Sequence, residues 1–562
     1  MPRPGLTLII GIALAAPLPA QAPMTAVDSA RHALDRLAYG ATPGQIDAIA
    51  RGGVMKWVDD QLAMPDLHDP SLRPVEAQAD VLRFSAADLD QMLQNNQKRA
   101  AAAKAEPDSS RRQQMLDDIR RDQVGSRRDL GRLDNEIPAL TVARAVQSDR
   151  QLGEILADFW TNHFNVYINK GQDRAYFADY LEHSIRDHAL GRFEDLLIAT
   201  AESPAMLFYL DNAQSVADDT GQRRAALLAA AQQRNGARRG LKFAPRAGTF
   251  QAELMADSTR LANQSATAAR APRGLNENYA RELMELHTLG VDGGYSQQDV
   301  ITVARILTGW SIDRASGTFL FRAPAHDAGA KLLFGQTFPA GHGQDEGIRL
   351  LRLLANAPAT IHHVSAELCA RFVADVPPDG CIDDAVRAWT QSHGEIRAVM
   401  HAIVHSPDFW ASANVENKVK TPLEFVASAL RAVNGTSDST PRVAQRVGQL
   451  GEPLFQHQTP DGYGEREEDW VNSGALLARM NFAVQLASGR MPGTMVDLDH
   501  VVDATTDHPA LVTAINQAIL GGAMTDHTRT TILKEIADVP DPRMARALAV
   551  GLALGGPEFQ KQ

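Results

Sequence analysis

Four side chains in this sequence are best suited to acid–base or metal chemistry. His163 lies in the segment FWTNHFNV, and Glu282, Glu285 and His287 lie together in the segment NENYARELMELHTLG. Imidazoles and carboxylates transfer protons near neutral pH and bind divalent metals. The sequence therefore predicts these four residues as catalytic, provided that the fold brings them together.

The segment that carries the glutamates is expected to be a helix that cannot bind a metal alone. His287 lies two residues from Glu285 and five from Glu282, and these offsets correspond to about 200° and 140° around a helix, so neither pair shares a face. The same polar groups can instead form ion pairs on a solvated or interhelical face. A divalent metal therefore stays open as a cofactor, without assigned ligands. The apolar stripe of this helix consists of Tyr279, Leu283, Leu286 and Leu289.

The helix expected around His163 places the imidazole on its apolar face. Leu156, Trp160 and His163 follow the positions i, i+4 and i+7. One interpretation is a buried core histidine that satisfies other buried polar groups. The other is a metal ligand or a general base. Only the second element that packs against this helix can distinguish the two.

We predict that the two histidine-bearing helices pack together around one cavity. Each helix carries polar groups at the edge of its apolar stripe, and buried polar groups need partners. The groups expected to face the cavity are Asn162, His163, Glu282 and His287, close to Asp211 and Asn212. The side chains predicted to bind substrate are Asn162, Asn278, Arg281, Asp211, Asn212, His326 and Asp327.

Other catalytic signatures are weaker or missing from the sequence. His326 and Asp327, in a glycine-containing loop, can position a base or a cation, but the same pair can cap a turn. The sequence has no G-x-S-x-G elbow, and neither cysteine lies in a catalytic context. An acyl-enzyme hydrolase is therefore disfavoured.

Composition restricts the class of protein. The chain has 562 residues, of which 44% are hydrophobic and 22% are charged, as in globular proteins with a large core. Its formal net charge of -12 disfavours nucleic acid as a partner, because phosphate binding needs a basic surface. After the N-terminal segment, no apolar run is long enough to span a bilayer, so no transmembrane anchor is expected.

Residues 1–22 are expected to be a signal peptide. Arg3 supplies the positive charge, residues 6–16 form an apolar run too short for a transmembrane anchor, and residues 20–22 (AQA) offer a cleavage site. We therefore expect a periplasmic or secreted protein. In such a compartment Cys369 and Cys381 are expected to form a disulfide across a short loop, and two buried free thiols are the alternative.

Helical periodicity dominates the chain after residue 22, so the predicted fold is mainly α. We expect one large helical domain over 23–562, with at most a minor β-hairpin from segments 318–322 and 332–338. The charged stretch at about 95–132 is expected to be a solvated helical hairpin or a partly disordered arm. The stretch at about 216–273, rich in Ala, Arg, Gln and Gly, indicates an insertion that forms either a flap over the site or a surface excursion.

Start and stop signals define three further helices. Residues 43–62 are expected to form one helix after a Gly-Ala-Thr-Pro turn. Ser296 and Asp299 form a capping box for a helix whose apolar face extends to Trp310. The motif TPLE at 421–424 combines an N-cap, a proline at the first helical position and a capping-box glutamate, so we assign it a structural role.

Several sequence blocks resemble the domain-of-unknown-function 1800 family of exported bacterial proteins. The resemblance covers nearly the whole chain after the signal segment and implies a mostly helical fold, without a catalytic map. It also implies a gene neighbour of the domain-of-unknown-function 1501 family, which resembles the alkaline phosphatase and sulfatase superfamily. The blocks are RHALDRLAYGATPGQI, FWTNHFNV, IRDHALGRFEDLL, SPAMLFYLDN, the NENYARE segment, HDAGAKLLFG, KVKTPLEFVASALRA and TPDGYG.

Two classes of function remain open from the sequence. The first is an exported hydrolase or lyase that acts on an envelope or extracellular glycan. The second is a non-catalytic envelope protein that binds or assembles with the phosphatase- or sulfatase-like partner. A concave pocket where His163 and His287 lie close together favours the enzyme, and scattered solvent-facing polar groups favour the assembly protein.

Overall fold

The computed structural model describes residues 24–123, 130–217, 274–438 and 440–562. The expected signal peptide and residues 218–273 of the expected insertion lie outside these ranges. Within them the protein is mainly α-helical, as the sequence predicts. No described helix is long and apolar enough to cross a membrane.

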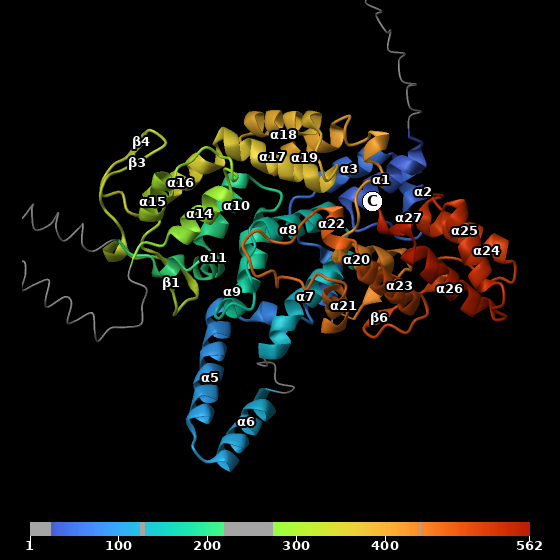
Figure 1. Ribbon diagram of the computed structural model, residues 1–562, viewed down its shortest axis with the longest axis horizontal. Helices are drawn as coiled ribbons and strands as arrows, with labels where there is room; N and C mark the ends of the chain where they lie inside the picture. Colours follow the sequence, from blue (N-terminus) through green and yellow to red (C-terminus); the bar gives the residue numbers. More distant parts are fainter. Residues whose placement is uncertain (1–23, 124–129, 218–273, 439) are drawn as a thin grey trace, which may run out of the picture.

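The N-terminal part of the chain supplies a central helix and a projecting hairpin. The central helix is α8, which carries His163 at its last position. Residues 95–123 of the charged stretch fall in the hairpin of α5 and α6, which pack against each other and project from the body (Figure 1), and residues 124–129 of the stretch lie outside the described ranges. The helices of this part are α1 (Ala26–Leu37), α2 (Gln45–Gly52), α3 (Val54–Leu62), α4 (Arg73–Glu76), α5 (Ala86–Ala105), α6 (Ser109–Gln123), α7 (Leu130–Gln147), α8 (Gln151–His163), α9 (Asp173–Asp179), α10 (Phe193–Glu202) and α11 (Pro204–Tyr209).

The middle of the chain forms one end of the molecule and a layer beside α8. In Figure 1, α14 to α16 lie with α10 and α11 at one end, while α17 to α19 run along the top. A disulfide between Cys369 and Cys381 joins α17 to α18, which confirms the predicted pairing. The helices of this part are α14 (Glu277–Glu285), α15 (Gln297–Ile306), α16 (Gln344–Ala355), α17 (Pro358–Phe372), α18 (Asp379–Ser392) and α19 (Ile396–His405).

The C-terminal part packs one fully buried helix against a terminal bundle. Every residue of α20 is buried, and its predicted capping box and first-turn proline are both present. Residues 560–562 run antiparallel to residues 418–420 just before this helix, with backbone bonds of 2.9 to 3.3 Å. The helices of this part are α20 (Pro422–Ala432), α21 (Pro441–Gln449), α22 (Glu467–Trp470), α23 (Ser473–Ala487), α24 (His508–Leu520), α25 (Asp526–Ile536), α26 (Pro542–Gly555) and α27 (Pro557–Gln560).

The β-structure is limited to small two-stranded sheets, and its pairing differs from the expected single hairpin. Segment 318–322 pairs with the preceding residues, because Gly309 (φ +82°) ends the turn after α15 and Trp310 begins a strand. Segment 332–338 forms a hairpin of its own. The strands are β1 (Trp310–Asp313), β2 (Thr318–Phe321), β3 (Lys331–Leu333), β4 (Gln336–Phe338), β5 (Thr436–Ser437) and β6 (Thr494–Met495).

Two expected helices are shorter than the sequence suggests. The helix expected over 43–62 is broken at Gly53, whose φ of +100° separates α2 from α3. The helix expected to reach Leu289 ends as α14 at Glu285, because both Leu286 and His287 direct their amides to the carbonyl of Glu282. His287 therefore lies beyond the helix. Apolar residues from nearly the whole described chain join one continuous core.

Candidate functional site

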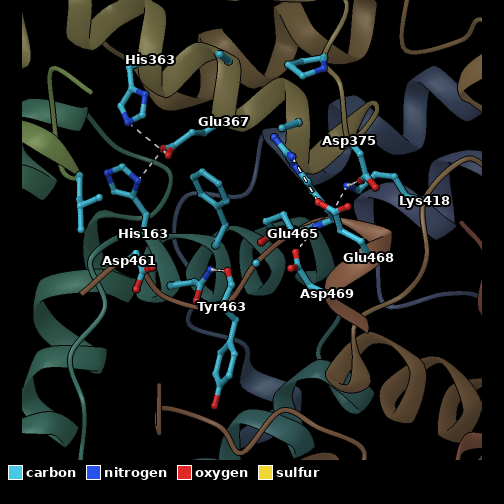
Figure 2. Close-up of a pocket in the computed structure, with 18 residues that line it drawn as sticks. His163, His363, Glu367, Asp375, Lys418, Asp461, Tyr463, Glu465, Glu468 and Asp469 are labelled. Atoms are coloured by element: carbon cyan, nitrogen blue, oxygen red, sulfur yellow. Dashed lines mark hydrogen bonds and ion pairs between the residues drawn. The ribbon is translucent and has the colours of Figure 1, made fainter. Parts of the chain in front are cut away.

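A cavity of about 570 Å³ lies between α8, α17 and the loop that precedes α22 (Figure 2). Asn162 and His163 reach it from the end of α8, and the TPDGYG block supplies part of its wall. Its polar lining residues are Asn162, His163, His363, Glu367, Asp375, Lys418, Asp461, Tyr463, Glu465, Arg466, Glu468 and Asp469.

At one end of the cavity a carboxylate lies between two imidazoles. His163 Nδ1 lies 2.8 Å from Glu367 Oε2, and His363 Nε2 lies 3.4 Å from Glu367 Oε1. Glu367 and His363 are one turn apart on α17, so the helix presents both to the same side. The other nitrogen of His163, Nε2, lies 3.3 Å from the carbonyl oxygen of His287. Both ring nitrogens of His163 therefore face oxygen acceptors.

This arrangement favours the ionised form of Glu367. Burial alone would raise the pKa of the Glu367 carboxyl group. The charge and hydrogen bond of His163, together with the charge of His363, outweigh burial and hold this pKa below its usual range. Glu367 is therefore a carboxylate near neutral pH, and His163 holds its orientation.

His287 lies beside His163 but does not line the cavity. The two ring centroids are 6.2 Å apart, as the predicted convergence of the two segments requires. His287 is buried, its Nε2 has no hydrogen-bond partner among the described residues, and burial followed by the charge of His163 lowers its pKa to about 3. His287 is thus a neutral ring near neutral pH, and its backbone carbonyl is the group that contacts His163.

The glutamates of α14 lie outside the lining of the cavity, although the charge of Asp461, a lining residue, acts on Glu282. Burial raises the pKa of Glu282, and the charge of Glu285 adds to the effect, but neither glutamate lines the cavity. Glu285 accepts a hydrogen bond of 3.4 Å from the Tyr295 hydroxyl, and Arg281 donates one of 2.7 Å to Gln297. Asn278, on the same helix, is exposed. These contacts agree with the alternative in which the polar groups of this helix pair with one another and with neighbouring elements on a solvated or interhelical face.

The remaining predicted residues lie in two other places. Asp211 is exposed and pairs with Lys170 at 3.1 Å, while Asn212 is buried and donates to the carbonyls of the α15–β1 turn. His326 is buried with Nδ1 2.9 Å from the carbonyl of Thr308. Asp327 accepts a bond of 2.7 Å from Arg305 and caps its own turn. None of these four residues lines the cavity.

Asn162 fixes the loop that forms the cavity wall. Its Nδ2 donates to the carbonyl of Tyr463 at 2.8 Å, and its Oδ1 accepts from the Tyr463 amide at 2.7 Å. Gly462 (φ +69°) makes this close approach feasible, because a Cβ there would lie 2.5 Å from the carbonyl oxygen of Asn162. Asn162 therefore acts as a loop anchor that also lines the cavity.

The other end of the cavity contains a carboxyl group of opposite character. Burial raises the pKa of Glu465, and the nearby Arg371, whose Nε lies 3.6 Å away, only partly offsets the effect. Arg371 is itself buried and held by Glu424 of the TPLE motif at 2.6 Å. Lys418, from the segment before α20, pairs with Asp375 and donates to the carbonyl of Glu465 at 3.1 Å.

Beneath Glu465 lie two further acidic groups that few polar contacts stabilise. Asp158 of α8 and Glu452 border a cavity of about 30 Å³ together with Glu465. Burial raises the pKa of Asp158 to about 7, and burial together with the charge of Asp158 raises that of Glu452. Protons are therefore retained among these acids near neutral pH.

The cavity does not offer a compact metal site. Among the described residues, no three His, Cys, Asp or Glu side chains of its lining have donor atoms all within 4.8 Å of one another. Glu367 occupies the space between His163 and His363 instead.

The sequence matches the model of one protein family over nearly its whole length. The model of the family described as protein of unknown function (DUF1800) matches residues 32–561. The chain belongs to the DUF1800 family. Neither the curated proteins nor the solved structures include a significant match to it.

Some cavity residues of this DUF1800 protein had no clear signal in the sequence. Glu367 and His363 lie on an ordinary amphipathic helix, and Arg371 and Asp158 look like helix-surface charges until the fold buries them. Glu465 belongs to a run of acidic residues that typically indicates an exposed loop. The TPDGYG block was the available signal, since two glycines beside an aromatic residue indicate a close backbone approach.

Proposed function

We propose that this DUF1800 protein is a hydrolase that cleaves glycosidic bonds in an envelope or extracellular glycan. The observation that carries the proposal is a pair of carboxyl groups in one cavity with opposite pKa shifts. The pKa of Glu367 is lowered by its histidine partners, whereas that of Glu465 is raised by burial. Such a pair assigns a base and an acid within one site.

In this proposal each carboxyl group has one task. Glu465 donates its proton to the glycosidic oxygen as the bond from that oxygen to the anomeric carbon breaks. Glu367 accepts a proton from a water molecule whose oxygen bonds to the same carbon. His163 is a positioning residue, because it holds Glu367 through Nδ1 and is itself held by the His287 carbonyl. A lyase would need a uronate substrate, whose carboxyl group acidifies the neighbouring C–H bond, and the acidic lining of the cavity disfavours such a substrate.

The charge of the cavity narrows the substrate class. Among the described residues, six acidic side chains line it, whereas Lys418 and Arg466 are the only permanently cationic ones that do. Lys418 is already paired with Asp375. An acidic cavity repels uronate polymers and nucleic acids and favours neutral or amine-bearing sugars. Because a signal peptide is predicted, we propose that the protein acts outside the cytoplasm.

The test compares two conservative variants with a surface control. Glu367→Gln and Glu465→Gln should each lower kcat by about 100-fold or more on neutral or glucosamine-containing polysaccharides, measured as release of reducing ends. Glu535→Gln, at an exposed position on α25, should behave as wild type. His163→Gln should shift the acid limb of the pH profile to higher pH, because His163 lowers the pKa of Glu367.

A pH profile separates the enzyme from the non-catalytic alternative. Activity should rise as Glu367 ionises and fall as Glu465 loses its proton, so the profile should be bell-shaped. If the wild-type protein binds these polysaccharides without releasing reducing ends or unsaturated products, the non-catalytic binding protein is favoured. The predicted partner of the domain-of-unknown-function 1501 family then becomes the next candidate ligand.

A further inference from the structure

Two histidines and an aspartate form a compact cluster on the surface, outside the cavity. His401 and His405 lie one turn apart at the end of α19, and Asp59 lies on α3. One donor atom from each of the three residues lies within 4.8 Å of the other two, and all three residues are exposed. Among the described residues, this is the group of His, Cys, Asp and Glu side chains that meets this spacing.

The ring orientations of the two imidazoles suit metal binding. Their rings stack with centroids 3.8 Å apart and an interplanar angle of 14°. Nδ1 of His405 donates to the carbonyl oxygen of His401 at 2.8 Å, so in the neutral ring Nε2 is the nitrogen with a free lone pair. A metal-binding histidine typically donates its second ring nitrogen in this way, which fixes the tautomer and the ring orientation.

The charges around the cluster favour a cation. The Asp59 carboxylate makes no hydrogen bond or ion pair with another described residue. Its neighbour Asp60 pairs with Lys56 instead. Asp59 therefore has a negative charge available to the two rings.

We propose that Asp59, His401 and His405 bind one divalent transition-metal ion of the Zn²⁺ type. Two imidazole nitrogens and one carboxylate oxygen are ligands that Zn²⁺ prefers, and a fourth position remains for water. Zn²⁺ binds its ligand atoms at about 2.0–2.2 Å, so the three donor atoms of a bound ion lie closer to one another than 4.8 Å. Rotation of the three exposed side chains can bring the donor atoms to these shorter distances. Mg²⁺ and Ca²⁺ prefer sets of oxygen ligands and do not fit this group.

The ion would tie together two distant parts of the chain. α3 and α19 pack against each other, and Arg397 at the start of α19 donates to the carbonyl of Leu62 at 3.1 Å. A bound ion adds a bridge across the same interface. Binding to the folded state alone stabilises that state, so the ion should raise the unfolding temperature.

The experiment uses the full chain, freed of metal with a chelator, and ZnCl₂ as the probe. Calorimetry should give one high-affinity equivalent for the wild type, and His401→Gln and Asp59→Asn should each weaken binding at least tenfold. His527→Gln removes an exposed histidine of α25 and is the matched control, which should bind as the wild type does. Zn²⁺ should raise the Tm of the wild type and of the control, whereas Mg²⁺ should leave both unchanged.

Two further measurements distinguish loss of metal binding from loss of folding in the variants. The metal-free variants should unfold at the wild-type temperature, because the three side chains are exposed. Co²⁺ in place of Zn²⁺ should give the visible absorption of a four-coordinate ion in the wild type and lose it in His401→Gln. Equal Zn²⁺ affinity in the wild type and in a His401→Gln/His405→Gln variant would overturn the site, as would the absence of binding to the wild type.

Discussion

Replacement of Asp158 by asparagine should stabilise the protein at alkaline pH. The carboxyl group lies on α8 beside two small cavities of about 30 and 20 Å³, and no hydrogen bond to it comes from another described residue. Burial raises its pKa to about 7, and the charges of Glu465 and Glu424 add to the effect against the opposing charge of Arg371. Asparagine has nearly the same shape but no charge to bury.

The size of the effect follows from the pKa. The ordinary aspartate pKa is 3.8 and the pKa in the folded protein is about 7, and each tenfold change in the acid dissociation constant corresponds to about 1.4 kcal/mol. A carboxyl group with a raised pKa stabilises the fold while it is protonated, fully below about pH 4, and this contribution is lost as pH rises through about 7. The variant should exceed the wild type by up to about 4 kcal/mol at pH 8 and by less than half of that at pH 5.

Urea denaturation at pH 5, 6.5 and 8 measures this difference. Asp503→Asn is the matched control, because Asp503 is exposed and makes no hydrogen bond or ion pair with another described residue. Its effect should be small at every pH. If Asp158→Asn is less stable than the wild type at pH 8, or if the difference does not change with pH, the carboxyl group is ionised in the fold and the reasoning fails.

Two further variants test the contacts that shape the cavity. Cys369→Ser should lower the free energy of unfolding by about 3 kcal/mol, because the disulfide closes a short loop, and reduction of the wild-type protein should give the same loss in urea denaturation. Asn162→Ala should cost about 1–3 kcal/mol, because two hydrogen bonds to Tyr463 are lost. Hydrogen exchange of the Tyr463 amide should then accelerate, and an unchanged exchange rate would contradict the anchoring role of Asn162.

Local sequence signals predicted which segments form helices and where several of them begin, but they did not predict where the helices end. The capping boxes at Ser296 and Thr421 are present because each depends on residues only three positions apart. Trp310 was assigned to a helix because its spacing fits the apolar face of α15, yet Gly309 turns the chain and a strand follows. Gly53 divided an expected helix in the same way. Periodicity does not show where a glycine adopts a positive φ.

Only one feature of the site, the proximity of His163 and His287, was predictable from the sequence, because buried polar groups need polar partners. The convergence of His163 and His287 followed from this requirement, and their rings are 6.2 Å apart. The partner that binds the imidazole of His163, Glu367, was not predictable, because its own helix gives no sign of which face meets α8. Glu282 and His287 were expected to face the cavity and Glu285 was expected to be catalytic, but none of the three lines the cavity.

The short ladder between residues 418–420 and 560–562 has a consequence for biosynthesis. Lys418 reaches the cavity, and Glu424, one turn into α20, holds Arg371 beneath it and also accepts a bond of 3.0 Å from the Gln562 side chain. A ribosome makes residues 560–562 after every other element described above. A nascent chain still attached at that point therefore lacks the strand that fixes Lys418 and the last partner of Glu424. The cavity can be completed only after these residues have been synthesised and have reached the compartment in which the protein folds, however early the surrounding helices form.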